Sequence, residues 1–148
     1  MTKIMVDTNI LVYAYDPWEP DKQKVAQQIL QVIASQGIGV ISTQVLAEFF
    51  NITTRKIKPP LTAAEAYARL ETYVRTWQVI DVTGAMVLEA ARGVRDYQFH
   101  FWDAQIWATA RLSQILLVLS EDFNAGSPIE GVRFANPFAP TFDLNQWL

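Results

Sequence analysis

The chain has 148 residues and is 51% hydrophobic, so it can bury the core of one domain and is too apolar to be a disordered segment. The absence of cysteine and the single histidine exclude disulfides, thiolate metal sites and a zinc site built from histidines. The net charge of −3 excludes a broad basic surface, so any nucleic acid would be held locally. Asp7 comes too early for a signal peptide, and no apolar run approaches the roughly 18 residues of a membrane helix. We therefore expect one cytoplasmic domain spanning residues 1–148.

The N-terminal half alternates short apolar runs with segments of helical periodicity. In chain order we expect a strand at 4–6, a helix at 21–35, a strand at 38–41 and a helix at 43–56. Gly37 ends the first helix, because glycine favours the left-handed conformation that follows a helix. Thr43 is expected to cap the second helix, which must end before Pro59.

The C-terminal half continues the alternation. It predicts a helix at 62–76, a strand at 79–82, helices at 83–95 and 102–113, and strands at 116–119 and 132–135. Residues 116–119 lack polar alternation, as expected for a strand covered on both faces. Asn124 and Gly126 mark a loop between the last two strands. Strands separated by helices indicate an α/β fold with a parallel sheet between helical layers.

Acidic residues follow or lie beside four of these apolar segments: Asp7, Glu48, Asp103 and Asp122. In a parallel sheet, ligands bind beyond the carboxyl ends of the strands, so these carboxylates are expected to gather at one edge. Buried carboxylates repel one another unless something compensates their charge, and a divalent cation is the usual compensation. Carboxylates without histidine or cysteine favour a hard ion, Mg²⁺ or Mn²⁺, and therefore phosphate chemistry.

Each of these acids also has a structural interpretation. Asp7 follows a strand, where aspartate often caps a turn. Glu48 lies on an apolar helix face, where the alternative to a ligand is a buried ion pair with an arginine. Asp103 lies in the first turn of its helix, where acids are common. Either member of the pair Glu121–Asp122 could face the site.

Other charged residues are weaker candidates. Asp81 also follows an apolar run, but the strand pattern continues beyond it, so we interpret it as structural. His100 is interpreted as a loop or interface residue rather than a ligand or general base. Basic residues Arg55, Lys56 and Lys58 end the Glu48 helix, where such residues are ordinary, or they hold RNA phosphates near the acids.

Five segments, in this order, resemble PIN-domain nucleases, and most closely the VapC-type toxins of bacterial toxin–antitoxin pairs. They are Val6 to Tyr13, Ser42 to Asn51, Phe101 to Ala108, Leu119 to Gly126 and Ile129 to Phe138. Each segment alone is a weak signal, but the ordered set is specific and spans nearly the whole chain. The stretch from Tyr15 to Pro20 departs from the family pattern because it is richer in proline and tryptophan, so we expect it to alter the antitoxin or substrate groove.

The resemblance implies a three-layer α/β/α sandwich and a Mg²⁺- or Mn²⁺-dependent ribonuclease. It assigns the catalytic and metal-ligand set to Asp7, Glu48, Asp103 and Asp122, and resolves the choice between Glu121 and Asp122 in favour of Asp122. It assigns supporting roles to Asn9 and Ser42. It further implies a homodimer and an antitoxin that wraps the toxin and blocks its site.

The chemistry expected of such a site is attack of a metal-activated water on the scissile phosphorus, with RNA bases splayed against aromatic side chains. One alternative is a PIN fold that only binds a partner, although the retention of all four acids argues against it. A second is a DNA or flap nuclease using the same acids, for which the chain is short. A phosphatase or response-regulator-like domain would need an acidic pair near the N-terminus and a lysine after the last strands, which the sequence lacks.

Overall fold

A computed structural model describes residues 2–123 and 127–148, and a five-stranded parallel sheet forms the centre of the molecule. Its strands are β1 (Ile4–Val6), β2 (Gly39–Ser42), β3 (Gln78–Ile80), β4 (Leu117–Leu119) and β5 (Arg133–Ala135). Their order across the sheet is β3-β2-β1-β4-β5. The central strand β1 is fixed on both sides, since Met5 pairs with Val40 of β2 and with Val118 of β4.

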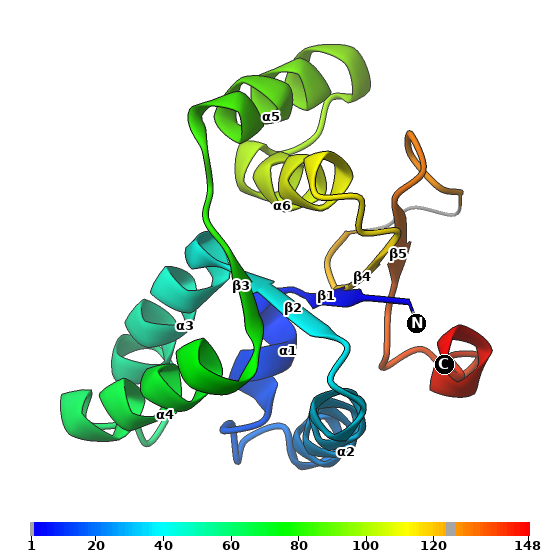
Figure 1. Ribbon diagram of the computed structural model, residues 1–148. Helices are drawn as coiled ribbons and strands as arrows, with labels where there is room; N and C mark the ends of the chain where they lie inside the picture. The colour runs from blue at the N-terminus through cyan, green and yellow to red at the C-terminus, as the bar shows by residue number, and fades with distance from the viewer. Residues whose placement is uncertain (1, 124–126) are drawn as a thin grey trace.

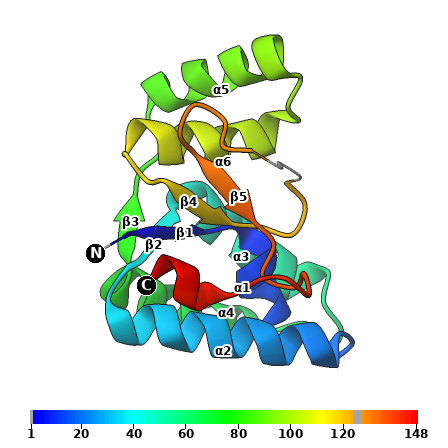
Figure 2. The same ribbon diagram turned by 90° about the vertical axis from the view of Figure 1, so that its right-hand side faces the viewer.

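Helices cover both faces of this sheet, which gives the three layers expected from the sequence (Figures 1 and 2). One layer contains α1 (Thr8–Tyr13), α2 (Pro20–Gln36), α3 (Thr43–Arg55) and α4 (Ala63–Thr76). The other contains α5 (Gly84–Tyr97) and α6 (Phe101–Leu112), which pack on each other. A 3₁₀ helix, η1 (Leu144–Trp147), lies near the C-terminus. No helix in the described ranges is long and apolar enough to cross a membrane.

Most of the predicted element ends are confirmed within two residues, and the capping chemistry explains why. Gly37 ends α2 in the left-handed conformation, at φ +67°. Thr62 caps α4 in a reciprocal capping box with Glu65, and the Thr83 hydroxyl accepts a hydrogen bond from the backbone of Met86 in α5. The loop expected at Asn124 and Gly126 lies outside the described residues.

One local prediction is wrong, and one helix was not predicted. Ser42, not Thr43, caps α3: the Ser42 hydroxyl accepts a hydrogen bond from the backbone N–H of Val45. The Thr43 hydroxyl instead accepts from the backbone of Val82, beyond β3. Helix α1 was not predicted, because six residues are too few to establish a helical period.

The connections between strands create a crevice at the carboxyl edge of the sheet. The chain passes from β1 to β2 and then to β3 through α1–α4 on one face, and returns from β3 to β4 through α5 and α6 on the other (Figure 1). The direction of winding therefore reverses between β1 and β4, and ligands of open α/β sheets bind at such a point. Asp7 directly follows β1, and the segment Ser120–Asp122 follows β4.

Candidate active site

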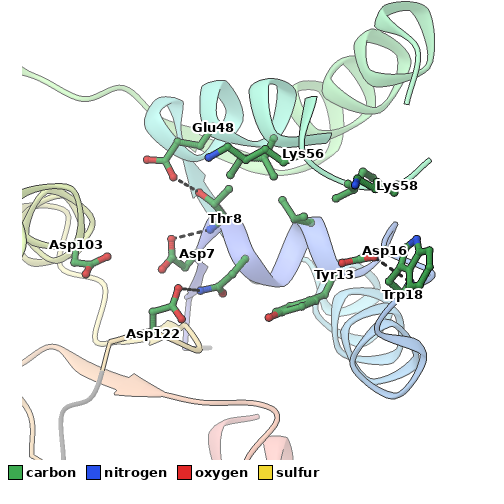
Figure 3. A pocket seen from close by; sticks show the side chains of 14 residues that line it. Asp7, Thr8, Tyr13, Asp16, Trp18, Glu48, Lys56, Lys58, Asp103 and Asp122 are labelled. Atoms are coloured by element: carbon green, nitrogen blue, oxygen red, sulfur yellow. Dashed lines mark hydrogen bonds between the residues drawn. The ribbon is translucent and has the colours of Figure 1, made fainter. Parts of the chain in front are cut away.

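A groove with a volume of about 650 Å³ lies at this edge and is lined by all four acids singled out in the sequence (Figure 3). Asp7, Glu48, Asp103 and Asp122 come from four segments that are distant in the chain, and their side chains gather at one end of the groove. The described structure thus brings the four acids to one edge of the sheet, as the sequence predicts.

Asp7 is the most buried of these acids, with 8% of its surface exposed. It caps α1: its Oδ1 accepts a hydrogen bond from the backbone N–H of Thr8, at 2.7 Å. Its Oδ2 accepts from the hydroxyl of Ser120, also at 2.7 Å. Burial raises the pKa of Asp7 to about 6; the two hydrogen bonds oppose this shift, and the charges of Glu48 and Asp103 add to it.

Glu48 is half-buried on α3, and neutral groups hold both of its carboxylate oxygens. Oε2 accepts from the Thr8 hydroxyl at 2.8 Å, and Oε1 accepts from the Gln44 amide at 2.6 Å. The Gln44 carbonyl oxygen in turn accepts from the amide of Gln105 on α6, at 2.7 Å. The predicted alternative, an ion pair with an arginine, is not formed within the described part of the chain.

The adjacent acids Glu121 and Asp122 have different partners. Asp122 is exposed in the groove and accepts a hydrogen bond from the amide of Asn9, at 3.1 Å. Glu121 forms an ion pair with Lys22 at 2.6 Å and accepts a hydrogen bond from the Tyr13 hydroxyl at 2.6 Å. Since Lys22 and Tyr13 hold Glu121 against α1 and α2, Asp122 is the member of the pair that lines the groove.

Asp103 lies in the first turn of α6 and is partly exposed. Its pKa is raised above the usual value mainly by burial, and further by the charges of Asp122 and Glu48, while His100 opposes the shift. Among the described residues, no hydrogen bond or ion pair compensates its side-chain charge. Asp103 is therefore the least compensated of the acids in the groove.

The remaining predicted residues fall into two groups. Asn9, Lys56 and Lys58 line the groove, with the lysines exposed. Ser42 and Arg55 are not among its lining residues: Ser42 is buried as the α3 cap, and Arg55 is exposed at the end of α3.

Two other residues that the sequence analysis set aside also stay outside the groove. Asp81 is exposed just beyond β3, and His100 precedes α6 as its N-cap. Neither lines the groove, which agrees with their interpretation as structural or loop residues.

Sequence reasoning named Asn9 but missed three of the neutral side chains that hold the acids in place: Ser120, Gln44 and Gln105. Ser120 lies 113 positions from Asp7, and no local pattern connects the two. Gln44 carried a usable signal, because it lies four residues before Glu48 on the same face of α3. Its second partner, Gln105, is 61 positions away and could be found only from the fold.

Within the described ranges, the acids at this end of the groove have no basic partner. Among the described residues, none of the ion pairs involves Asp7, Glu48, Asp103 or Asp122. Their hydrogen-bond donors are amides, hydroxyls and a backbone N–H, all of which are neutral. Carboxylates brought together without a compensating cation are expected to repel one another.

The donor chemistry fits a hard divalent ion that keeps part of its water shell. Within residues 2–123 and 127–148, no three acidic or histidine side chains are gathered tightly enough to hold an ion together as they stand. Mg²⁺ does not require such a cage, because it retains several waters and is commonly held by one or two carboxylates together with substrate phosphates. Carboxylate oxygens without sulfur or imidazole donors suit Mg²⁺ or Mn²⁺ better than zinc.

Fold and groove together define a doubly wound α/β protein with an acid-lined groove at its topological switch point, where ligands of such sheets bind. The sequence model of the PIN domain matches residues 4–125, and the chain belongs to this family. This confirms the resemblance found in the sequence.

Several solved structures share the fold. A toxin–antitoxin complex from Klebsiella pneumoniae aligns with a TM-score of 0.68 at 18% identity, covering 92% of this chain and 98% of that one. VapC20 from Mycobacterium tuberculosis, a toxin that cleaves the sarcin–ricin loop, aligns with a TM-score of 0.66 at 20% identity, covering 86% of this chain and 98% of that one. DNA-bound VapBC from Salmonella typhimurium aligns with a TM-score of 0.65 at 20% identity, covering 93% of this chain and 99% of that one. No curated protein sequence matches the chain significantly.

Proposed function

We propose that the chain, acting as one nuclease domain over residues 1–148, is a divalent-metal-dependent endoribonuclease and the toxin of a toxin–antitoxin pair. The observation that carries the proposal is the gathering of Asp7, Glu48, Asp103 and Asp122 in one groove without a basic partner among the described residues. Membership in the PIN domain family and a fold shared with a toxin that cleaves the sarcin–ricin loop support it.

The four carboxylates are the candidate ligands of Mg²⁺ or Mn²⁺, of which one or two would hold the ion directly together with its own waters. When bound, the ion supplies Lewis-acid activation of water and neutralises the charge that develops on the phosphate during cleavage. Asp7 sits deepest, where Ser120 and the Thr8 backbone fix both of its oxygens. A carboxylate fixed in this way needs little reorganisation to act as a ligand.

Neutral side chains orient the other two hydrogen-bonded acids. The Thr8 hydroxyl and Gln44 hold Glu48, and Gln105 holds Gln44, so a chain of hydrogen bonds links α1, α3 and α6. Asn9 orients Asp122. Because these donors are uncharged, they position the carboxylates without neutralising them, which leaves the negative charge available to a cation.

Lys56 and Lys58 line the same groove and would hold the RNA backbone. A chain of net charge −3 has no general attraction for RNA, so local cations must offset the repulsion between the acids and the phosphates. This role for the lysines agrees with their exposure and with their position along the groove (Figure 3).

The direct test is RNA cleavage by the purified protein, freed of any partner, in Mg²⁺ or Mn²⁺ and again in excess EDTA. We expect cleavage of RNA only when the metal is present, and little cleavage of a single-stranded DNA of the same sequence. Equal cleavage in EDTA would rule out the metal mechanism. Preferential cleavage of DNA would favour the alternative of a DNA nuclease, and no cleavage of either would favour a PIN fold that only binds a partner.

We further propose an antitoxin partner that covers the groove, and a homodimer. The similar structures from Klebsiella pneumoniae and Salmonella typhimurium contain a toxin together with its antitoxin. Expression of this chain alone is expected to arrest growth, and co-expression of a small protein encoded beside it is expected to relieve the arrest. Growth arrest that persists in Asp103→Asn would separate toxicity from the acidic groove and contradict the proposal.

A further inference from the structure

The groove extends beyond the acids to a turn between α1 and α2 that carries an exposed tryptophan. Trp18 lines the groove together with Lys58, at the end opposite Asp103 (Figure 3). The turn belongs to the segment from Tyr15 to Pro20, which contains two prolines and Trp18. Asp16 and Trp18 of this segment lie on the wall of the candidate active site.

Trp18 is 74% exposed, whereas Trp107 is fully buried and donates its indole N–H to the backbone of Ile129. Within the described residues, Trp18 takes part in none of the ring–ring contacts. An indole left in water forgoes the free energy of burying its large apolar surface. Trp18 therefore contributes little to the core and is available to a ligand.

The turn fixes the backbone that carries the ring. The backbone N–H of Trp18 donates to the Asp16 carboxylate at 3.0 Å, and Pro17 restricts the preceding backbone. The turn is anchored by α1 on one side and by α2, which begins at Pro20, on the other. A ring presented on a braced turn loses less conformational entropy on stacking than one on a free loop.

Charge around the ring favours a nucleic acid. Lys56 and Lys58 line the same groove and are exposed, and among the described residues neither is in an ion pair. Asp16 is also on the wall, but its carboxylate accepts the hydrogen bond that fixes the turn. An exposed aromatic ring beside cations is the combination that binds single-stranded nucleic acid, through base stacking and phosphate contacts.

We propose that Trp18 is a stacking platform for an unpaired base of the RNA substrate, with Lys58 contacting a neighbouring phosphate. The scissile phosphate lies at the acidic end of the groove. The stacked base therefore belongs to a nucleotide that does not adjoin the cleavage point but lies further along the strand. The platform rests on the proposed ribonuclease function and adds a specificity-determining residue to it.

The test measures binding and cleavage separately. Binding is followed in EDTA with a fluorescent, unstructured RNA of about 12 nucleotides, within the range that single-strand binders cover. We expect Trp18→Ala to weaken binding roughly 5- to 150-fold, since a stacked base contributes about 1–3 kcal/mol. Trp18→Phe should retain most of the affinity, because phenylalanine keeps a face for stacking. The matched control is Tyr67→Ala, which removes an exposed aromatic ring from α4, outside the groove.

The lysine is tested through the dependence of RNA binding on salt. Lys58→Ala should reduce the slope of log affinity against log salt by about 0.7, the value for one phosphate contact on a single strand. Lys24→Ala removes an exposed charge from α2, away from the groove, and should leave the slope unchanged. In cleavage with Mg²⁺, Trp18→Ala should raise KM and leave kcat within about twofold, as expected when binding is lost equally from substrate and transition state.

The outcomes separate this inference from the proposed function. A wild-type protein that neither binds nor cleaves RNA would overturn both. A wild-type protein that cleaves RNA while Trp18→Ala binds and cleaves equally well would overturn the platform alone. In that case the exposed ring would be assigned to a protein partner. Equal losses in Trp18→Ala and Trp18→Phe would also overturn stacking, because phenylalanine keeps an aromatic face.

Discussion

Replacing Asp7 with asparagine is expected to reduce metal-dependent RNA cleavage by at least about 10³-fold, because removing a metal-ligating charge costs several kcal/mol of transition-state stabilisation. Asparagine preserves the local structure: its carbonyl can accept from the Thr8 backbone, and its amide can donate to the Ser120 hydroxyl. The measurement is the initial rate of cleavage in saturating Mg²⁺.

The matched control for this experiment is Asp81→Asn, the same substitution at an exposed acid outside the groove. It should leave the cleavage rate within about twofold, as expected for a surface change away from the site. Cleavage by Asp7→Asn at the wild-type rate would contradict a catalytic role for Asp7. A melting temperature of Asp7→Asn at or above that of the wild type would exclude unfolding as the cause of a loss.

The metal-free protein is expected to lose stability as the pH rises through the pKa of Asp7. Burial raises this pKa from 3.8 to about 6, so the folded state binds the proton more tightly than the unfolded state. The stabilisation from this proton is complete below pH 3.8 and is lost as the pH rises through about 6. At 1.36 kcal/mol per pKa unit, the full loss amounts to about 3 kcal/mol.

This prediction is tested by urea unfolding of the wild type and Asp7→Asn in EDTA. Between about pH 4.5 and about pH 7.5, the wild type should lose roughly 2 kcal/mol of unfolding free energy relative to the variant. Other titrating groups are common to both proteins, so the difference isolates Asp7. A difference that stays constant over this range would show that Asp7 ionises as freely in the folded protein as in the unfolded chain.

The sequence predicts the large elements of this fold well, because their signals are local. Helix α2 has a clear apolar period and a terminal glycine, and α4 and α5 begin at threonines that cap them. The short helix α1 escaped prediction because its residues follow a strand directly and complete less than two turns. Its cap is Asp7, so the predicted turn-capping role and the groove position belong to the same residue.

The candidate site also has a part that could be predicted from the sequence and a part that could not. The positions of the acids after strands or in early helical turns follow from the sequence, whereas their partners depend on contacts between distant segments. The spacing of the residues does not distinguish Glu121 from Asp122, and only the resemblance to PIN-domain nucleases favoured Asp122. The difference comes from Lys22 and Tyr13, which hold Glu121, and from Asn9, which holds Asp122. Long-range hydrogen bonds of this kind could not be predicted from the sequence alone.

Asp103 provides the most direct test that the groove binds a cation. Burial is the main cause that raises the pKa of Asp103, and the charges of Asp122 and Glu48 raise it further. Asp103→Asn should relieve about 1 kcal/mol of this repulsion at nearly constant shape. A structural acid paired with an arginine would behave in the opposite way, because removing one partner of a buried pair costs about 3–5 kcal/mol.

The decisive measurement is therefore a thermal melt of the wild type and Asp103→Asn, each in EDTA and in millimolar Mn²⁺. We expect the variant to melt at a higher temperature than the wild type in EDTA. We expect Mn²⁺ to raise the melting temperature of the wild type, because the ion binds only the folded state, and to have little effect on the variant. A large drop in the melting temperature of Asp103→Asn in EDTA, together with an undiminished response to Mn²⁺, would make Asp103 a structural residue and contradict the metal site.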